Sequence, residues 1–456
     1  MRYASVFLSH AHEDKPFVRK VADRLVRKGI VVWEDVDQLR AGQVLRTTIK
    51  KAIENQTAIA VFFSKESLNS NWCDNELTQA LQAESGQSDD EKWIIPVFLG
   101  DPLTLVLSSR LLKLDWLDLD GDGVQRFYIS ANAESDPDDI ANIASRIAER
   151  VYELLGFSRA PEVGVVVDQR GVGRRVGDPP VPGNLSSADI PALVFRPDQL
   201  DRDDKQVLRG EEWEGFSQDV RGSLHTALGN LRSGRMVRIA GDGQTGLFYL
   251  LGRIFDRNTG VKLSCHHSHS DNVAPILNNS HNWLEAALLG DGNPKPSSLA
   301  VLKNAPRELQ PGEDAPVVAL LLFRASAPHY LREAVQHVQA EGAEAPPCVW
   351  LQPPSTLQAA DARQLVADVL KLVRRLRNEH GTEEVRIYSD LPVNLMPLLA
   401  AQLTHKDIIE VVFMEYDYEK ARGRRSPKEL YAALNMAPEK RPVPEVERAP
   451  ELPEPP

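Results

Sequence analysis

Short apolar segments alternate with amphipathic helical segments along the first part of this 456-residue chain, and this alternation restricts the folds it can adopt. Thr57–Phe63 and Trp93–Leu99 are apolar runs of strand length. Asp14–Lys28, Val44–Asn55 and Ile140–Leu155 instead repeat apolar residues every three or four positions, as on one face of a helix. Apolar strands separated by helices are typical of a parallel sheet covered on both faces. We therefore predict that the chain begins with an α/β domain.

Polar residues follow the predicted strands of this domain. Ser9 and His10 come after the predicted strand Tyr3–Leu8, and the loops Glu34–Gln43 and Ser64–Trp72 come after two others. In open α/β sheets, ligands bind beyond the carboxyl ends of the strands. A binding site in this domain is therefore expected among these loops.

Glu76 is the residue with the clearest chemical potential. Trp72 and Glu76 stand four residues apart in a predicted helix, so they share one of its faces. A carboxylate beside an indole, just past a strand end, can hold a polar ligand. The alternative is a surface glutamate that the helix dipole stabilises.

Four motifs in chain order resemble the TIR-domain family. Ser5–His10 looks like the first strand of that family and the turn after it, and Gly29–Asp35 looks like the second strand. Leu39–Gly42 is similar to its BB loop. Trp72–Leu77 is similar to the W-C-x-x-E-L motif in which TIR enzymes carry their catalytic glutamate.

The resemblance implies a flavodoxin-like fold, a parallel sheet with helices on both faces, and an enzyme that cleaves the bond between nicotinamide and ribose in NAD+. A carboxylate can stabilise the oxocarbenium-like transition state of such a reaction. NAD+ is then the substrate, and no cofactor is expected. The implied residues are catalytic Glu76, substrate-binding Phe7, Ser9, Trp33, Asp35 and Trp72, and the assembly residues Leu39, Arg40, Ala41 and Gly42 of the BB loop.

Composition and charge restrict the partners of the chain. The net charge of −12 argues against a general DNA or RNA binder, because long nucleic acids are bound mainly through positive charge. Cys73, Cys265 and Cys348 lie far apart, which fits a reducing compartment without a disulfide framework. No apolar run approaches the roughly 18 residues of a membrane span, and no signal peptide is evident. We expect a cytoplasmic protein.

Changes in composition divide the chain into four parts. The TIR-like domain covers residues 1–158. Residues 159–191 are rich in Gly and Pro and are expected to be a linker, with room for one short strand. Residues 192–436 return to an α/β pattern. Residues 437–456 are rich in Pro and Glu and are expected to be disordered.

The second α/β region contains a distant internal repeat. A strand beginning Val-Arg-Ile, a polar turn, an apolar helix and another strand occur first from Met236 to Cys265 and again from Glu384 to Met414. The repeat suggests two Rossmann-like halves, about residues 192–312 and 313–436, that face each other across a pseudo-symmetric cleft. The alternative is that βαβ units resemble one another in many proteins.

This region resembles the SAVED domain, a sensor of two fused CARF-like halves. The resemblance rests on Val385–Pro392, the helix Leu395–Leu403 and the closing strand Val411–Asp417. It implies a ligand that is a cyclic oligonucleotide, foremost cyclic tri-adenylate, made by a partner synthase. Because such a ligand needs backbone amides, positive charge and flat side chains, the candidate contacts are Gly241, Thr245, Arg253, Trp283, Tyr388, Ser389, Pro392 and Asn394.

The histidines after the strand Val261–Cys265 are a weaker signal. His266, His267 and His269 lack the cysteine or carboxylate partners at defined spacing that zinc sites usually have. We therefore expect a strand-end loop at this position and no metal.

Together these features predict an antiviral effector of a cyclic-nucleotide-based anti-phage system (CBASS). The sensor would bind its ligand, the chains would oligomerise, and the TIR domain would destroy NAD+. Three alternatives remain: a TIR adaptor without catalysis, a TIR enzyme that makes cyclic ADP-ribose, and a sensor for another nucleotide such as a dinucleotide.

Overall fold

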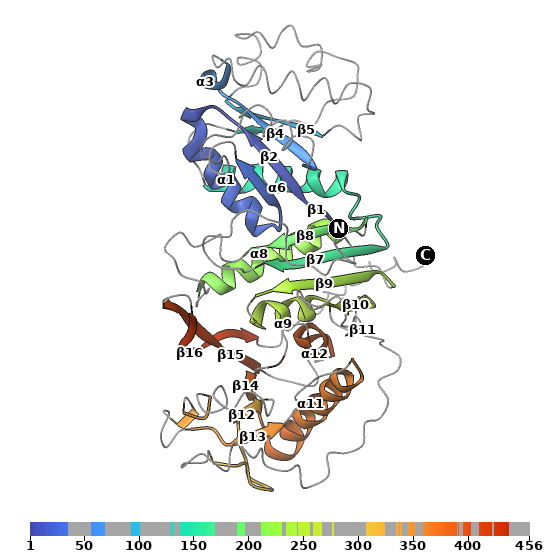
Figure 1. Cartoon of the computed structure of the whole chain (residues 1–456), viewed down its shortest axis with the longest axis vertical. Coiled ribbons are helices and arrows are strands. Elements are labelled where there is room, and N and C mark those ends of the chain that lie inside the picture. The colour runs from blue at the N-terminus through green and yellow to red at the C-terminus, as the bar shows by residue number, and fades with distance from the viewer. Residues whose placement is uncertain are drawn as a thin grey trace, which may run out of the picture.

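The structure is a computed structural model. It describes residues 1–34, 56–68, 93–100, 129–131, 137–168, 189–196, 211–229, 234–243, 245–255, 259–266, 276–277, 307–323, 334–336, 338–339, 345–351, 359–389, 391, 395–402, 410–421 and 424–436. Three β-sheets follow one another along the long axis of the molecule, with helices between them (Figure 1).

The first sheet is parallel throughout and has the strand order β3-β2-β4-β5-β6. This is the flavodoxin-like order, in which the first strand lies inside the sheet between the second and the third. The prediction of a parallel α/β domain is thus confirmed. Its strands are β2 (Ser5–Ser9), β3 (Val31–Glu34), β4 (Ala58–Phe63), β5 (Ile94–Leu99) and β6 (Ile129–Ala131).

Helices α1 (Lys15–Arg27) and α6 (Pro137–Leu154) cover one face of this sheet. Alternate strand residues, among them Val6 and Phe62, are buried beneath them. The predicted helix Val44–Asn55 lies outside the described residues. Two short helices lie at the sheet edge, η1 (His12–Asp14) and α3 (Lys65–Leu68).

The second sheet has the order β1-β8-β7-β9-β10-β11, and its pairs are parallel except for the last. Helices α8 (Glu211–Leu228) and α9 (Thr245–Ile254) pack on it. Its strands are β1 (Arg2–Tyr3), β7 (Glu162–Asp168), β8 (Pro191–Phe195), β9 (Met236–Asp242), β10 (Lys262–Cys265) and β11 (Ile276–Leu277).

Two sequence expectations need correction here. The predicted strand Tyr3–Leu8 is two strands in different sheets, separated by Ala4: β1 pairs with β8, while β2 belongs to the first sheet. The predicted linker is shorter than expected, because its residues 162–168 form β7, which lies between β8 and β9 in the second sheet. The sequence left room for one short strand in this Gly- and Pro-rich stretch; the observed strand has seven residues, of which all but Glu162 are buried.

The third sheet has the order β13-β12-β14-β15-β16 and is parallel except for its last pair. Helices α11 (Ala359–His380) and α12 (Met396–Gln402) accompany it. Its strands are β12 (Val317–Leu322), β13 (Cys348–Leu351), β14 (Glu384–Ser389), β15 (Glu410–Ala421) and β16 (Arg424–Met436).

The second and third sheets have equivalent topologies once β1 is set aside. Each has its first strand between its second and third, and each ends in an antiparallel strand. The register agrees as well: Val167 of β7 pairs with Gly241 of β9, and Leu322 of β12 pairs with Ser389 of β14. Gly241 and Ser389 are the residues that the repeated Val-Arg-Ile motif places in equivalent positions. The internal repeat therefore reflects two related α/β halves.

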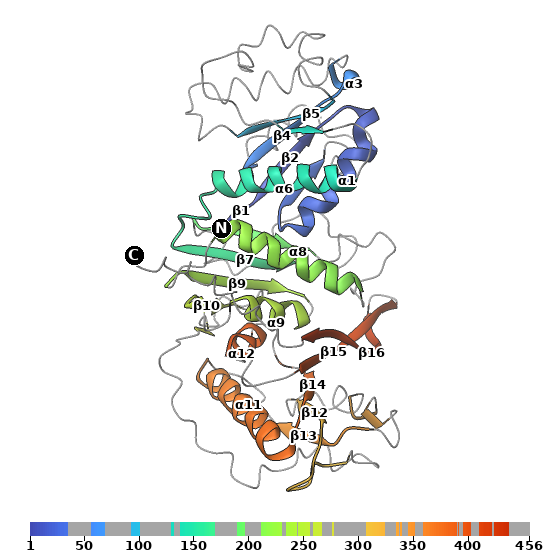
Figure 2. The ribbon, with the colours of Figure 1, turned by 180° about the vertical axis from the view of Figure 1, so that it is seen from behind.

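The equivalent helices α9 and α12 pack against each other between these halves (Figures 1 and 2). A Cβ atom on Gly252 of α9 would lie 2.2 Å from the carbonyl oxygen of Pro397 in α12. The glycine therefore permits a close approach of two helix backbones.

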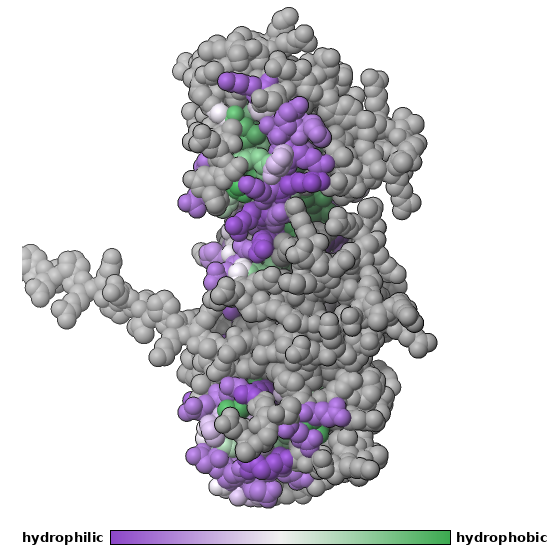
Figure 3. All heavy atoms as spheres, turned by 90° about the vertical axis from the view of Figure 1, so that its left-hand side faces the viewer, coloured by the Kyte–Doolittle hydropathy of each residue, from purple (hydrophilic) through white to green (hydrophobic). Residues whose placement is uncertain are grey.

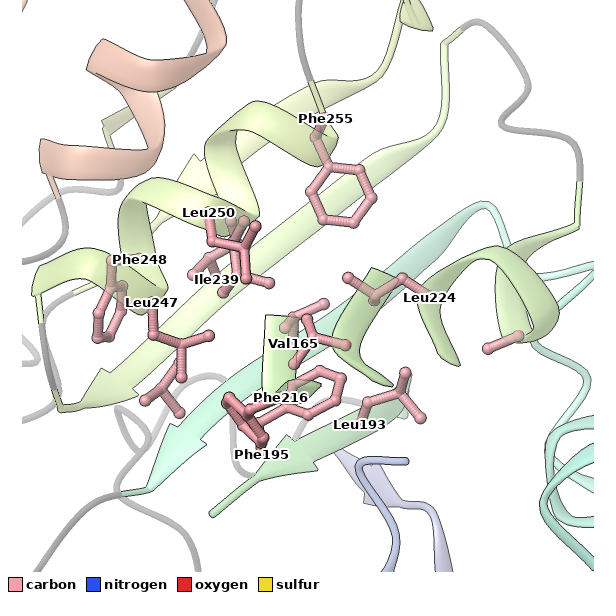
Figure 4. Close-up of a cluster of buried hydrophobic side chains, with 14 of the residues drawn as sticks. Val165, Leu193, Phe195, Phe216, Leu224, Ile239, Leu247, Phe248, Leu250 and Phe255 are labelled. Carbon is pink, nitrogen blue, oxygen red and sulfur yellow. The ribbon is translucent and has the colours of Figure 1, made fainter. Parts of the chain in front are cut away.

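The TIR-like domain is fastened to the first half by contacts on several elements. Arg235 donates hydrogen bonds to the carbonyl oxygens of Leu228 at 3.1 Å and Ser158 at 2.6 Å, which joins the end of α8 to the segment after α6. Arg27 of α1 forms an ion pair with Asp219 of α8. Figure 4 shows α8 and α9 contributing side chains to one buried cluster over the second sheet. The domain and the first half thus share a continuous packed core.

The surface of the described residues is mainly hydrophilic on the face shown in Figure 3, with small apolar areas between. Among the described helices, none combines the length and the hydropathy that a membrane span requires.

Candidate functional site

The switch point of the first sheet lies between β2 and β4. From β2 the chain continues to β3 on one side, and from β4 it continues to β5 on the other side. Ligands of open α/β sheets bind in the crevice beyond such a point. Ser9 ends β2, Glu34 ends β3 and Ser64 directly follows β4. The first residues of the three predicted polar loops therefore lie at the same edge of the sheet.

Three of the predicted substrate-binding residues share one face of this sheet. Phe7 is paired in register with Trp33, and Ser9 lies two residues further along the same strand. Side chains of paired residues in parallel strands point to the same side, and this side is opposite to α1 and α6. Phe7 and Ser9 are 2% and 3% exposed, so Phe7 acts as a packing residue here. Asp35, Trp72, Glu76 and the BB loop Leu39–Gly42 lie outside the described residues.

A hydrogen-bond network fixes the turn that leads from β4 toward Glu76. The Ser64 hydroxyl donates to Oδ2 of Asp14 at 2.6 Å. The backbone N–H of Ser67 donates to Ser64 Oγ, and the N–H of Ser64 donates to Ser67 Oγ, at 3.0 and 2.8 Å. This reciprocal arrangement caps the start of α3. Asp14 was not among the sequence candidates, because its bond joins residues fifty positions apart.

His10 lies on the other side of the edge, toward α1. Its Nδ1 donates to the carbonyl oxygen of Leu8 at 3.1 Å. Burial lowers the pKa of the His10 imidazole, so the ring is neutral at pH 7. With the proton on Nδ1, Nε2 is left as an acceptor.

Gly241, predicted to begin the turn, lies in β9, which runs to Asp242, and it adopts a geometry that only glycine tolerates. Gly241 has φ +126°, and a Cβ atom there would lie 1.9 Å from the carbonyl oxygen of Val167. Helix α9 begins four residues later at Thr245, so its amino terminus lies at the strand edge. Arg253 is in the last turn of α9, about 12 Å along the helix axis from Thr245. The structure therefore does not bring Arg253 together with the other two candidates.

The corresponding turn in the other half differs. The Tyr388 ring is 1% exposed and packs with Ala319, Leu321 and Phe323, so it is a core residue and leaves no open face for a base. Ser389 ends β14, and its hydroxyl accepts a hydrogen bond from the N–H of Leu391 at 3.0 Å. Trp283, Pro392 and Asn394 lie outside the described residues.

Two polar pairs lie at the carboxyl edge of the second sheet, and of their residues the sequence analysis singled out only His266. Asp168 ends β7 and Arg196 directly follows β8, and the two form an ion pair with 3.0 Å between Nε and Oδ2. His266 follows β10, and its Nε2 is hydrogen-bonded to the Ser264 hydroxyl at 2.8 Å. Burial lowers the pKa of His266 to about 4, and the nearby Arg238 adds to this. Sequence reasoning missed Asp168 because it lies in the stretch that resembles a linker.

Among the described side chains, no group of three or more His, Cys, Asp or Glu residues is arranged to hold a metal ion. His267 and His269 are outside that part of the chain.

Comparison with known proteins assigns the first part of the chain. Residues 6–129 match the family model of the TIR domain, so this part of the chain is a TIR domain. The "NAD(+) hydrolase TcpC" of Escherichia coli O6:H1 is 36% identical over 93 residues, which are 20% of this chain and 30% of the relative. The "2' cyclic ADP-D-ribose synthase AbTIR" of Acinetobacter baumannii is 28% identical over 145 residues, 32% of this chain and 48% of the relative. The chain thus spans less than half the length of either relative.

The solved structures include the Acinetobacter baumannii Cap4 SAVED/CARF-domain receptor with the cyclic trinucleotide 3'3'3'-cAAA. It covers 81% of this chain, which in turn covers 87% of that receptor, with a TM-score of 0.37 and 12% sequence identity. A likeness of this degree is too weak to assign a ligand.

Proposed function

We propose that this protein is a NAD+ glycohydrolase whose TIR domain is switched on by a cyclic oligonucleotide bound to a SAVED-like sensor. NAD+ is the substrate, nicotinamide and ADP-ribose are the products, and no cofactor takes part. The observation that carries the proposal is the TIR-domain match over residues 6–129 together with relatives named as NAD(+) hydrolases.

Glu76 has the central role in this proposal. Departure of nicotinamide leaves positive charge on the ribosyl group, and the carboxylate stabilises that charge. Ser9 and Trp33 contribute from the face of the first sheet opposite to α1. The link from Asp14 to Ser64 supports the turn that precedes the Glu76 segment.

The test is NAD+ cleavage by the Glu76→Gln variant, which keeps the shape of the side chain and removes its charge. We expect loss of cleavage by at least about a hundredfold, with an unchanged melting temperature, because removing one group that stabilises transition-state charge typically has this effect. Glu66→Gln, ten residues earlier in the same region, serves as the control and keeps its activity. Wild-type turnover by Glu76→Gln would refute the assignment.

The sensor part of the proposal rests on the two equivalent α/β halves. They join through α9 and α12, and each has its own switch point, between β7 and β9 and between β12 and β14. Ligands bind beyond such points. Two equivalent halves therefore offer two similar binding positions, which suits a ligand built of repeated units. A cyclic oligoadenylate, foremost cyclic tri-adenylate, has such units.

Activation then takes place by assembly. Ligand-bound chains stack, and the BB loop around Leu39–Gly42 of one TIR domain completes the active site of the next. Light scattering during activation tests this step: growth of large particles with the onset of cleavage supports it, and a particle that stays monomeric while cleavage proceeds overturns it. In a bacterial host the outcome is NAD+ depletion during phage infection, the role of a CBASS effector in the cytoplasm.

A second candidate is synthesis of cyclic ADP-ribose. It is favoured by relatives named as 2' cyclic ADP-D-ribose synthases. Chromatography of the reaction products separates the two, because the hydrolase releases linear ADP-ribose and the synthase a cyclic isomer. A non-catalytic adaptor is the third candidate, and it requires Glu76 substitutions to have no effect on any activity of the protein.

A further inference from the structure

We infer that Arg196, held by Asp168, binds a phosphodiester group of the cyclic oligonucleotide. The inference rests on the proposed sensor function and assigns one of its contacts to the first half. Neither residue was among the sequence candidates for the sensor.

The position of the pair is the first reason. Val167 and Phe195 point into the core beneath α8 and α9, so the next residues, Asp168 and Arg196, lie on the opposite face at the carboxyl edge. Figure 4 shows Phe195 and Val165 on the helix-covered side of these strands. The edge is next to the switch point between β7 and β9, where an open α/β sheet binds its ligand.

The geometry of the pair is the second reason. Arg196 Nε donates to Asp168 Oδ2 at 3.0 Å, and the two side chains are 11% and 5% exposed. Among the described residues, Asp168 is the partner of Arg196. A guanidinium group is a planar fork with five donors. With Nε fixed by the carboxylate, the two terminal NH2 groups are oriented for bidentate contact with a phosphate.

The equivalent position in the other half is the third reason. Val167 of β7 and Leu322 of β12 hold equivalent positions in the two halves, so the residue after each is equivalent too. The counterpart of Asp168 is therefore Phe323, which is 3% exposed. The same topology therefore folds with an apolar residue at this place. Burying an ion pair is seldom more stabilising than burying apolar groups of similar size, so stability alone does not account for charges in one half only.

The unequal halves imply that the ligand is held asymmetrically. One phosphodiester contacts Arg196 in the first half, while register makes the neutral Gln352, which lies outside the described residues, the counterpart of Arg196 in the second half. The backbone N–H groups at the start of α9 lie at the same sheet edge and add to the positive potential there.

The test measures binding of cyclic tri-adenylate by titration calorimetry, with NAD+ cleavage as a second readout. Removing Arg196 alone would take the ion pair from the buried Asp168 carboxylate, so the main variant is the double substitution Asp168→Asn with Arg196→Gln. This variant keeps an amide pair and removes both charges. Arg238→Gln is the matched control, because Arg238 forms an ion pair with Glu162 on the same sheet face but away from the carboxyl edge.

We expect the double variant to bind cyclic tri-adenylate at least about tenfold more weakly, the loss expected for a charge-assisted contact. Arg238→Gln should bind within about twofold of the wild type. Arg196→Lys keeps the charge without the fork and should be intermediate. Circular dichroism and a melting temperature close to that of the wild type establish that the double variant is folded.

Two results would overturn the inference in different ways. Equal affinity of the wild type and the folded double variant refutes the role of Arg196 and leaves the sensor intact. A wild-type protein that binds none of the cyclic di-, tri- and tetranucleotides refutes the sensor function itself, and the inference with it.

Discussion

Single residues decide the geometry at the edge of the second sheet. Gly241 combines φ +126° with a carbonyl oxygen 1.9 Å from the place of a Cβ atom. At the same edge, His266 is 3% exposed and hydrogen-bonded to Ser264. Backbone strain and the burial of an imidazole both affect the free energy of unfolding, so substitutions at these two residues test them.

Gly241→Ala is expected to lower the free energy of unfolding by about 3 kcal/mol, because the new methyl group meets the β7 backbone in addition to the strain of a positive φ. Gly156→Ala is the control, since Gly156 has φ +69° and nothing within 4 Å of a Cβ atom. It should lose only about 1 kcal/mol. Urea unfolding measures both values, and equal losses would contradict the clash with Val167.

Acidification should destabilise the protein through His266. Its pKa is about 4 in the folded protein and 6.5 in the unfolded chain, so between these values the unfolded chain binds the extra proton. The stability from the neutral ring is complete above pH 6.5 and falls as the pH drops toward 4, by up to about 3 kcal/mol. His266→Gln should lose less stability over this interval. An identical pH dependence of unfolding in both proteins would contradict the assignment.

Helices and strands show which parts of the fold can be read from the sequence. Strand β13 and the two Val-Arg-Ile strands are predicted well, because apolar runs are a local signal. Strand β7 is predicted only as one short strand within a linker, because its Gly- and Pro-rich flank resembles a linker. The division of Tyr3–Leu8 between two sheets depends on distant pairing with β8.

The candidate site residues follow the same rule. Ser9 ends β2 and Thr245 begins α9, close to where the sequence places them, because a turn after an apolar run is a local signal. Tyr388 is buried instead of open, because its environment is made by β12 and not by its neighbours in sequence. The Asp168–Arg196 pair depends on register between strands and has no local signal.

The contact of α9 with α12 makes a prediction at the level of elements. Gly252→Ala should lower the free energy of unfolding by about 2 kcal/mol, because its Cβ atom would lie 2.2 Å from Pro397 O. Gly222→Ala in α8, with nothing within 4 Å, should instead raise it by about 0.5–1 kcal/mol. Chemical denaturation measures both. Stabilisation by Gly252→Ala would mean that the two halves are not in close contact there.

At the scale of the whole molecule, the TIR domain and the first half are physically one unit. Strand β1 is the edge strand of the second sheet, and Met1 packs with Val166 and Ala240 there. Arg235 and the Arg27–Asp219 pair connect α8 to the TIR domain. These contacts join the first half directly to the TIR domain.

A TIR fragment of residues 1–158 should accordingly be less stable than the same domain in the full chain. It loses β8 as the partner of β1 and exposes the surface of α1 and α6 that packs on α8. We expect a melting temperature lower by several degrees and increased binding of a hydrophobic dye. The full-length chain is the control, and equal melting of the fragment would contradict the shared core.

The most direct measurement is NAD+ cleavage by the purified full-length protein, alone and with a panel of cyclic di-, tri- and tetranucleotides. A ligand-gated TIR enzyme should be silent alone and should cleave NAD+ when one member, foremost cyclic tri-adenylate, is added. Cleavage that is equally fast without any member would contradict the sensor, and the absence of cleavage under every condition would contradict the enzyme.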